Sequence, residues 1–243
     1  MIFNSVLFSL GDPKDNLYIQ MFVIQYSSLL RTKSYNPETD EFYLTCDEDT
    51  ANYIQKTFPL VRHVKCLIHP KPKSTYDGMK MKFVLPFLLK LKDEPILYCD
   101  VDIFFMRQLR VDIPEDTIAV YPEGAATDSN YCGDFQLNAP FGFTAGFFAY
   151  RFGTTVCRFF AKLLDILDKE PKKFYTLDQP YFNKFLLLVR QIVMFESNMM
   201  SLNGNTHRDV ARVMNCCGEP GDGSFHWNKM LQLFLLSLVP TTA

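Results

Sequence analysis

Short apolar stretches of strand length alternate with longer stretches of helical periodicity over the first two-thirds of the chain. The predicted strands are Ile2–Leu10, Glu41–Cys46, Val61–Ile68, Pro95–Phe105, Thr117–Tyr121 and Phe143–Tyr150. Helical patterns lie between them at about 15–31, 48–58 and 75–91, and Pro86 is expected to kink or divide the last one. This alternation predicts an α/β fold in which helices flank a central, mostly parallel sheet.

The size and charge of the chain narrow the classes of function. Its 243 residues are 48% hydrophobic, which is enough to bury one large core, so we expect a single domain over residues 1–243. The net charge is −2 and Lys and Arg form no stripe, which predicts no nucleic-acid partner. No apolar run reaches the roughly 18 to 20 residues that span a bilayer, so we expect no transmembrane segment.

The cysteines and both ends of the sequence bear on the compartment. The seven cysteines show no C-x-x-C spacing, and the start, MIFNSVLFSLGDPKDN, lacks the basic residues of a signal peptide. These features predict buried free thiols in a reducing, cytoplasmic compartment, although an excised lumenal catalytic domain would look similar. The final apolar run, LQLFLLSLV, predicts either a core helix or a peripheral contact with a membrane surface.

Two carboxylates one residue apart, Asp100 and Asp102, interrupt the apolar stretch PILYCDVDIFF. An unpaired carboxylate is costly to bury, so such a pair at a strand end is normally exposed or bound to a cation. Carboxylate oxygens suit Mg²⁺ or Mn²⁺, and either ion would bridge to a diphosphate. The alternative is an ordinary capped turn after the strand, because short D-x-D strings are common by chance.

Several longer segments carry a family resemblance. In MKMKFVLPFLLKLKDEPILYCDVDIFF a helix, a basic turn and an apolar strand precede D-x-D, and the segments DNLYIQMFVIQYSSLL, FTAGFFAYR and LDQPYFNKFL occur at matching places. This order resembles the retaining glycosyltransferases of the GT-A fold, especially family 8 and its relatives. The resemblance covers roughly residues 1–230, with specific motifs only at these points.

The resemblance implies a fold and an activity. The expected fold is the GT-A type, with a Rossmann-like sheet, a nucleotide-binding half at 1–105 that ends in D-x-D, and a sugar and acceptor half at 106–243. The expected activity is transfer of a sugar from a nucleotide-diphosphate donor, with a UDP-sugar as the expected donor, with retention and with Mn²⁺ or Mg²⁺ as cofactor. The acceptor is left open among glycans, proteins and lipids.

The resemblance also implies roles for individual residues. Asp100, Asp102 and His226 are expected to hold the metal, and Asp178 and Gln179 to lie beneath the donor sugar as the catalytic pair. The other positions expected to bind the donor are Tyr18, Lys82, Asp100, Val101, Asp102, Ala145, Gly146 and Lys229.

Each of these positions has a structural alternative. Asp178 could cap the helix that begins near Gln179, and Lys82 could belong to a solvated helix face. Gly146 could relieve crowding within a strand, and Tyr18 could be an ordinary core residue.

Two departures from the family pattern leave other functions open. Thr144 stands where the family usually has Asn, and FHWNKM supplies His226 and Lys229 without the family's Gly and at a shorter spacing. A non-catalytic binder of nucleotide or glycan would tolerate both changes. A sugar nucleotidyltransferase is a further alternative, although SLGDPKDN is a poor version of the Gly-rich, basic phosphate loop that such enzymes carry.

Overall fold

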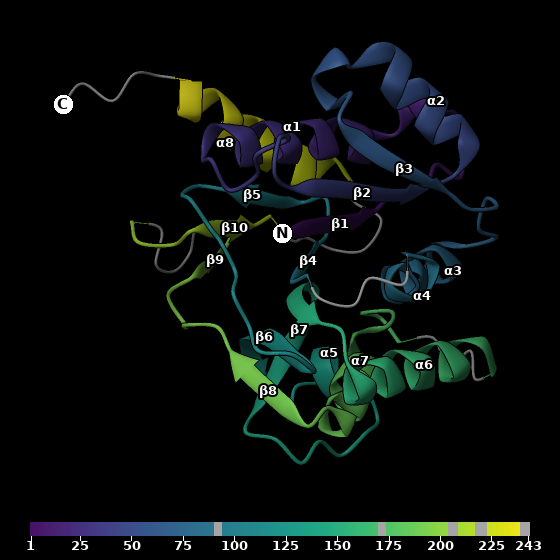
Figure 1. Ribbon diagram of the computed structural model, residues 1–243, viewed down its shortest axis with the longest axis vertical. Coiled ribbons are helices and arrows are strands. Elements are labelled where there is room, and N and C mark those ends of the chain that lie inside the picture. Colours follow the sequence, from purple (N-terminus) through teal and green to yellow (C-terminus); the bar gives the residue numbers. More distant parts are fainter. Residues whose placement is uncertain (90–93, 170–173, 204–208, 217–222, 239–243) are drawn as a thin grey trace.

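The computed structural model describes residues 1–89, 94–169, 174–203, 209–216 and 223–238. A central sheet has seven strands in the order β3-β2-β1-β4-β7-β6-β8, and a small sheet has the order β5-β10-β9 (Figure 1). The central strands are β1 (Ile2–Val6), β2 (Glu41–Cys46), β3 (Val64–Ile68), β4 (Ile96–Cys99), β6 (Thr117–Ala125), β7 (Phe141–Arg151) and β8 (Gln191–Met194). The small sheet is formed by β5 (Ile103–Phe105), β9 (Met200–Leu202) and β10 (Val213–Asn215).

The helices surround this framework. They are α1 (Leu17–Arg31), α2 (Glu48–Thr57), α3 (Thr75–Met79), α4 (Leu85–Leu89), α5 (Ser129–Cys132), α6 (Thr154–Lys169), α7 (Gln179–Phe185) and α8 (Gly223–Leu238). Short 3-10 helices lie at η1 (Pro13–Asp15), η2 (Pro59–Val61), η3 (Lys80–Phe83) and η4 (Leu186–Leu188). Figure 1 shows α1, α2 and α8 at one end of the view and α5, α6 and α7 at the other.

The pairing of the strands confirms the predicted mostly parallel sheet. Strands β3, β2, β1 and β4 pair in parallel, and so do β6 and β8. Only β7, among the described strands of the central sheet, runs antiparallel to its neighbours, β4 and β6. The carboxyl ends of the parallel strands therefore meet at one edge, where ligands bind in open α/β sheets.

Alternation along the strands produces two hydrophobic cores, one on each face of the central sheet. Phe3 and Phe147 belong to the core that is shared with α1 and α2. Tyr98 and Phe148 belong to the core that is shared with η3, α6 and α7. Burial on both faces explains why the strands read as nearly continuous apolar runs in the sequence.

The prediction of one strand over Pro95–Phe105 was wrong, because this segment forms two strands that belong to two different sheets. Strand β4 ends at Cys99, and the chain turns over Asp100–Asp102 before β5 pairs with β10. The amide of Ile103 donates to the carbonyl of Asp100 at 3.2 Å, which closes the turn. The two carboxylates thus lie in the connection between the two sheets.

Other predicted boundaries shift by a few residues. The first strand ends at Val6 and not at Leu10, and Val61 belongs to η2 and not to β3. Strands β6 and β7 extend to Ala125 and Arg151. The predicted helix at 75–91 is divided as Pro86 suggested, into α3, η3 and α4, and its last residues, 90 and 91, lie outside the described part of the chain.

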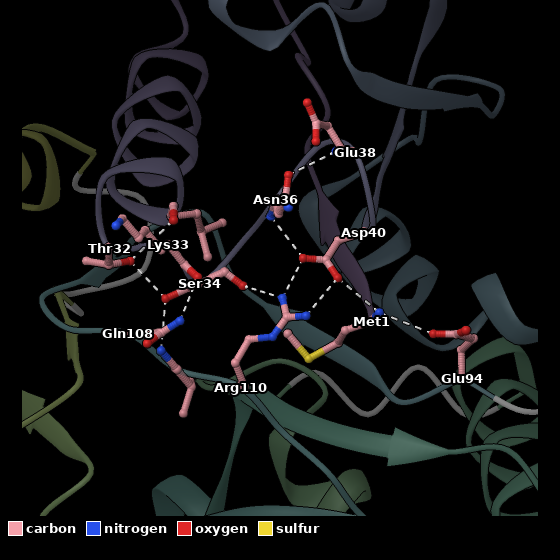
Figure 2. A network of polar contacts seen from close by, with 12 residues as sticks. Met1, Thr32, Lys33, Ser34, Asn36, Glu38, Asp40, Glu94, Gln108 and Arg110 are labelled. Atoms are coloured by element: carbon pink, nitrogen blue, oxygen red, sulfur yellow. Dashed lines mark hydrogen bonds and ion pairs between the residues drawn. The ribbon is translucent and has the colours of Figure 1, made fainter.

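A polar network around the buried Asp40 carboxylate holds the amino ends of the strands together (Figure 2). The Asp40 carboxylate accepts hydrogen bonds from both terminal nitrogens of Arg110, at 2.5 and 3.1 Å, and from the Met1 amino group at 3.1 Å. The Asn36 amide adds a bond of 2.9 Å. Burial would raise the pKa of Asp40, but these donors hold it below its usual value. The network ties β1 and the approach to β2 to the connection between β5 and β6, on the edge of the sheet opposite the cavity described below.

Helix α8 packs on α1 along only one of its sides. Met230 is buried against Met21 and Ile24, whereas Leu235 and Leu236 are more than half exposed. The predicted run LQLFLLSLV begins one residue after Met230, and none of its described residues is buried, although Leu233 and Phe234 pack partly buried against the same cluster. The run is therefore helical but only partly a core element, and its last residue, Val239, lies outside the described residues. No helix in the described part of the chain is long and apolar enough to cross a bilayer.

Candidate active site at the carboxyl edge of the sheet

An open cavity of about 360 Å³ lies at the carboxyl edge of the central sheet. Its wall is formed by the turn after β4, the middle of β7, the beginning of α7, and residues of β6 and β10. The charged and amide side chains on this wall include Lys82, Asp100, Asp102, Glu123, Asp178 and Gln179. Five of these six were predicted site residues, and the structure brings them together in one cavity.

The turn that carries the two aspartates is fixed from three sides. The Asp100 amide donates to the Gly146 carbonyl of β7 at 2.8 Å, and the Asp100 carbonyl accepts from the Gln25 side chain of α1 at 2.5 Å. The Asp102 carbonyl accepts from the amide of Cys216, just after β10, at 3.0 Å. All three bonds are made to backbone groups of the turn, so its backbone is held without the use of either carboxylate.

Lys82 occupies a buried position between two carboxylates. Its ammonium nitrogen lies 3.2 Å from Asp178 and 3.9 Å from Asp100, and it donates to the Ala145 carbonyl at 3.2 Å. Burial lowers the pKa of the ammonium, but the two carboxylates raise it above its usual value, so Lys82 stays charged at neutral pH. With 2% of its surface exposed, Lys82 does not belong to a solvated helix face.

Asp178 stands at the N-cap of α7, but its side chain makes no capping hydrogen bond. The carboxylate turns instead to Lys82, and burial raises its pKa despite that cation. The residue before it, Leu177, adopts a left-handed φ of 57°, a strained backbone conformation for a residue with a side chain. The capping alternative for Asp178 was therefore wrong, since the chain directs this carboxylate into the cavity.

Gln179 is held by backbone groups of two elements. Its Oε1 accepts from the Ala145 amide at 3.0 Å, and its Nε2 donates to the Asn130 carbonyl at 3.0 Å. These two bonds fix the plane of the amide against β7 and α5. The predicted pair Asp178 and Gln179 thus enters the cavity with one side chain ion-paired and the other locked in orientation.

Asp100 depends on two neighbours for its position. The Tyr98 hydroxyl donates to the Asp100 carboxylate from within the core beneath it. A Cβ at Gly146 would come within 2.6 Å of the other carboxylate oxygen, so only glycine leaves room for Asp100 there. Burial raises the pKa of Asp100 to about 6, while the Lys82 ammonium lowers it. Glycine at position 146 is therefore required for the position of the Asp100 carboxylate. Relief of crowding within the strand is not its whole role.

Asp102 is joined to helix α8 through His226. The Nδ1 of His226 lies 3.0 Å from the Asp102 carboxylate, and the imidazole is buried. The Tyr18 ring at the start of α1 meets the imidazole edge-on, with 6.0 Å between ring centres. The segment FHWNKM thus brings its histidine into contact with Asp102 of the D-x-D turn. It does so although the glycine and the spacing of the family 8 pattern are missing.

The chemistry of these side chains suits a hard divalent cation. Asp100 and Asp102 offer carboxylate oxygens and His226 offers an imidazole nitrogen, a donor set that Mn²⁺ accepts. The gap left by Gly146 keeps one Asp100 oxygen clear of the β7 backbone. Within the described residues, no group of three or more His, Cys, Asp or Glu side chains stands in a ready arrangement for a metal ion. The metal site is therefore a prediction that rests on residue type and on the Asp102–His226 contact.

Three predicted donor-binding residues lie away from the cavity wall, as far as the described chain defines that wall. Val101 is buried in the core shared with α1, and Tyr18 packs beside His226. The Lys229 ammonium lies 5.6 Å from the centre of the Phe225 ring, one turn beyond His226 on α8. Tyr18 thus contacts the histidine of the Asp102–His226 pair, Lys229 contacts Phe225, and the binding roles of both stay predictions.

One cavity residue was missed from the sequence. Glu123 is half-buried, and burial raises the pKa of its carboxyl to about 7, while hydrogen bonds from the Thr144 and Tyr131 hydroxyls lower it. The predicted strand ended at Tyr121 because Pro122 follows, whereas β6 continues through Pro122 with two register shifts. A carboxylate two residues after the apolar run TIAVY was the available signal.

Comparisons with known proteins add the fold relationship. No protein-family model and no curated protein sequence matches the chain. The solved structure of the bifunctional glycosyltransferase WbbM, in its apo form, aligns with a TM-score of 0.67 at 14% identity. That alignment covers 96% of this chain and 49% of the WbbM chain. This chain has the glycosyltransferase fold of the GT-A type.

Two further structures agree with the GT-A fold. The glycosyltransferase GlyE of Streptococcus pneumoniae TIGR4 gives a TM-score of 0.58 at 15% identity, covering all of this chain and 65% of its own. Mouse xyloside xylosyltransferase 1 gives 0.57 at 11% identity, with 88% and 96% covered. The chain thus spans about half of WbbM and just under two thirds of GlyE. At these identities the likeness establishes the fold, which confirms the predicted fold class, and family 8 membership stays a prediction.

Proposed function

We propose that this chain is a metal-dependent glycosyltransferase that moves a sugar from a UDP-sugar to an acceptor hydroxyl with retention of configuration. The proposal rests on one observation above all. Asp100, in the turn after β4, and Asp178, at the start of α7, share the buried Lys82 cation, while Asp102 contacts His226. The D-x-D turn and the predicted sugar-holding pair line one cavity at the carboxyl edge of the sheet, and ligands of open α/β sheets bind at that edge, which supports the proposal.

The reaction requires charge stabilisation at the leaving group. When the sugar–phosphate bond breaks, negative charge develops on the diphosphate, and catalysis depends on groups already oriented toward that charge. A divalent cation held by Asp100, Asp102 and His226 would supply Lewis-acid stabilisation of the diphosphate. In this proposal Lys229, one helical turn after His226, adds a positive charge on the same side, and Tyr18 packs against the nucleotide base.

The chain's own residues hold the sugar. Asp178 accepts hydrogen bonds from sugar hydroxyls, and Lys82 keeps that carboxylate ionised and aimed into the cavity. Gln179, fixed against Ala145 and Asn130, lies next to the anomeric carbon. The Ala145–Gly146 backbone, which lines the same cavity, faces the same sugar. The carboxylate and the amide together stabilise the positive character that the sugar ring acquires in the transition state.

This division of roles follows the two halves of the fold. Residues 1–105 supply the nucleotide-binding edge and the D-x-D turn, and residues 106–243 supply the sugar and acceptor side together with His226. The nature of the acceptor, whether glycan, protein or lipid, depends on surfaces that the fold alone does not define.

The test is a screen for donor cleavage. The purified chain is incubated with UDP-glucose, UDP-galactose, UDP-xylose and UDP-N-acetylglucosamine, with GDP-mannose for comparison, in Mn²⁺ or in EDTA, and release of the nucleoside diphosphate is measured. We expect release from at least one UDP-sugar in Mn²⁺ and none in EDTA. Asp178→Asn should reduce release at least 100-fold while UDP binding is retained. Absence of release from every donor would contradict the proposal.

A further inference from the structure

Glu123 lies on the described cavity wall but has no role in the proposed binding and cleavage of the donor. It stands on β6, on the same cavity as Asp102 and Gln179. The proposed metal and sugar roles use Asp100, Asp102, His226 and Asp178, and even a half-buried carboxylate is costly to retain without a ligand or a partner. Its surroundings show how the fold retains it.

Neutral hydrogen-bond donors from three elements hold the Glu123 carboxyl. The Asn215 amide of β10 donates to it at 3.4 Å, and the hydroxyls of Thr144 on β7 and Tyr131 on α5 also bond to it. No Lys, Arg or His pairs with Glu123 within the described chain. Asp102, a charge of the same sign, acts on it as well. The fold therefore orients this carboxyl without neutralising it.

The adjoining strands are shaped to seat one of these donors. Gly124 on β6 pairs with Gly142 on β7, and a Cβ at either position would come within 2.4 Å of the Tyr131 ring. Two facing glycines thus leave a slot for the ring, whose hydroxyl reaches Glu123. Thr144, which replaces the Asn of the family pattern, contributes its hydroxyl to the same carboxyl and also accepts from the Gly146 amide at 3.2 Å.

The charge of the site decides what Glu123 can bind. A diphosphate would be repelled by a carboxylate that lies near Asp102, so the nucleotide is the wrong ligand for this wall. A neutral hydroxyl is a suitable ligand, since a carboxylate accepts a hydrogen bond from O–H and such charge-assisted bonds are strong. Transfer needs one such hydroxyl, that of the acceptor, next to the sugar.

We propose that Glu123 binds the acceptor hydroxyl and orients its oxygen toward the anomeric carbon of the donor sugar. This proposal rests on the proposed glycosyltransferase function. In the transfer, the acceptor oxygen bonds to the anomeric carbon while the bond from that carbon to the phosphate oxygen breaks. The electron pair leaves with the diphosphate, and the hydroxyl proton passes to the departing phosphate oxygen. Glu123 fixes the direction of approach and keeps the hydroxyl within reach.

Water is the simplest hydroxyl acceptor and serves as the probe. Release of UDP from the best UDP-sugar of the screen is measured in Mn²⁺ for wild type, Glu123→Gln and Thr144→Val, and UDP affinity is measured alongside. The glutamine keeps the shape of the side chain and removes the carboxylate. Glu115→Gln, an exposed position shortly before β6, is the matched control.

We expect Glu123→Gln to lower kcat at least tenfold, while KM for the UDP-sugar and the affinity for UDP stay within about twofold. Thr144→Val should lower kcat less, because the carboxylate remains and loses one of its donors, and Glu115→Gln should match wild type. Unchanged kcat in Glu123→Gln would overturn the proposal, and so would a parallel loss of UDP or Mn²⁺ affinity. If wild type neither binds UDP nor cleaves any donor, the proposed function itself fails and this inference fails with it.

Discussion

The ammonium nitrogen of Lys82 lies 3.2 Å from the carboxylate of Asp178, and both groups are buried. This contact joins η3, which packs beneath the sheet, to the amino end of α7, and it holds the predicted sugar-binding carboxylate at the cavity. Asp100 lies 3.9 Å from the same ammonium, so one cation serves two carboxylates. The positions of both depend on Lys82.

Removing Lys82 should therefore destabilise the fold strongly. In Lys82→Met the Asp178 and Asp100 carboxylates lose their cation inside the protein, and breaking a buried pair in this way costs about 3–5 kcal/mol. Urea unfolding at pH 7 measures the change. Lys80→Met is the control, because Lys80 pairs with exposed Asp168 and should cost less than about 1 kcal/mol. Equal effects of the two substitutions would show that the buried pair is not important for stability.

Gly146→Ala should damage the site more than the fold. The new Cβ would lie 2.6 Å from an Asp100 oxygen, so the carboxylate must move away from its present position. We expect Mn²⁺-dependent UDP binding to weaken at least tenfold, while the unfolding midpoint changes little. Gly11→Ala is the control for folding, since a Cβ at Gly11 meets no atom within 4 Å. Normal UDP binding by Gly146→Ala would mean that the position of Asp100 is not critical.

His226→Gln tests the third predicted metal ligand. The imidazole contacts Asp102 at 3.0 Å, so its removal should weaken Mn²⁺ binding about tenfold or more, because one ligand is lost and Asp102 is no longer oriented. Electron paramagnetic resonance of free Mn²⁺ gives the affinity directly. Asn228→Gln alters an exposed neighbour on the same helix and should bind Mn²⁺ like wild type. Equal affinities in all three proteins would remove His226 from the metal site.

Glu123 should make the stability of the protein depend on pH. Its pKa in the folded chain is about 7, against 4.5 for an unperturbed glutamate, with burial as the main cause and Asp102 as the neighbouring charge. Between these values the folded chain keeps a proton that the unfolded chain releases, so this group lowers the free energy of unfolding as pH rises from about 4.5 to about 7.

Glu123→Gln removes this penalty. Its stability relative to wild type should therefore be greater at pH 8 than at pH 5, by about 1–3 kcal/mol, because one pKa unit corresponds to about 1.4 kcal/mol. Urea unfolding at the two pH values measures the difference. Glu115→Gln, at an exposed position, should show no such pH-dependent gain. An identical pH response of wild type and Glu123→Gln would argue against a raised pKa at Glu123.

Much of the fold follows from patterns that the sequence displays openly. Buried parallel strands appear as apolar runs, and Pro86 marked the division of the helical segment before β4. The D-x-D turn was recognisable because two carboxylates interrupt such a run. The break between β4 and β5 was not predictable, since Ile103–Phe105 is as apolar as β4 and only its pairing with β10 assigns it to another sheet.

The site could be predicted in its residue types and less well in its contacts. The resemblance supplied Asp178, but the partner that holds it depends on the path of η3 across the sheet, which no local pattern encodes. Glu123 was missed because Pro122 is a usual sign of a strand end, whereas paired glycines and register shifts carry β6 past it. Long-range packing determines both the partner of Asp178 and the continuation of β6 past Pro122.

The central claim is that Asp102 belongs to a metal-dependent nucleotide site. Calorimetric titration of UDP into wild type and Asp102→Asn, each in Mn²⁺ and in EDTA, tests it most directly, because asparagine keeps the shape of the side chain and removes its charge. We expect UDP to bind wild type in Mn²⁺, and at least 100-fold more weakly in EDTA or in the variant. Equal UDP affinity in all four titrations, or no binding by wild type in Mn²⁺, would contradict the account.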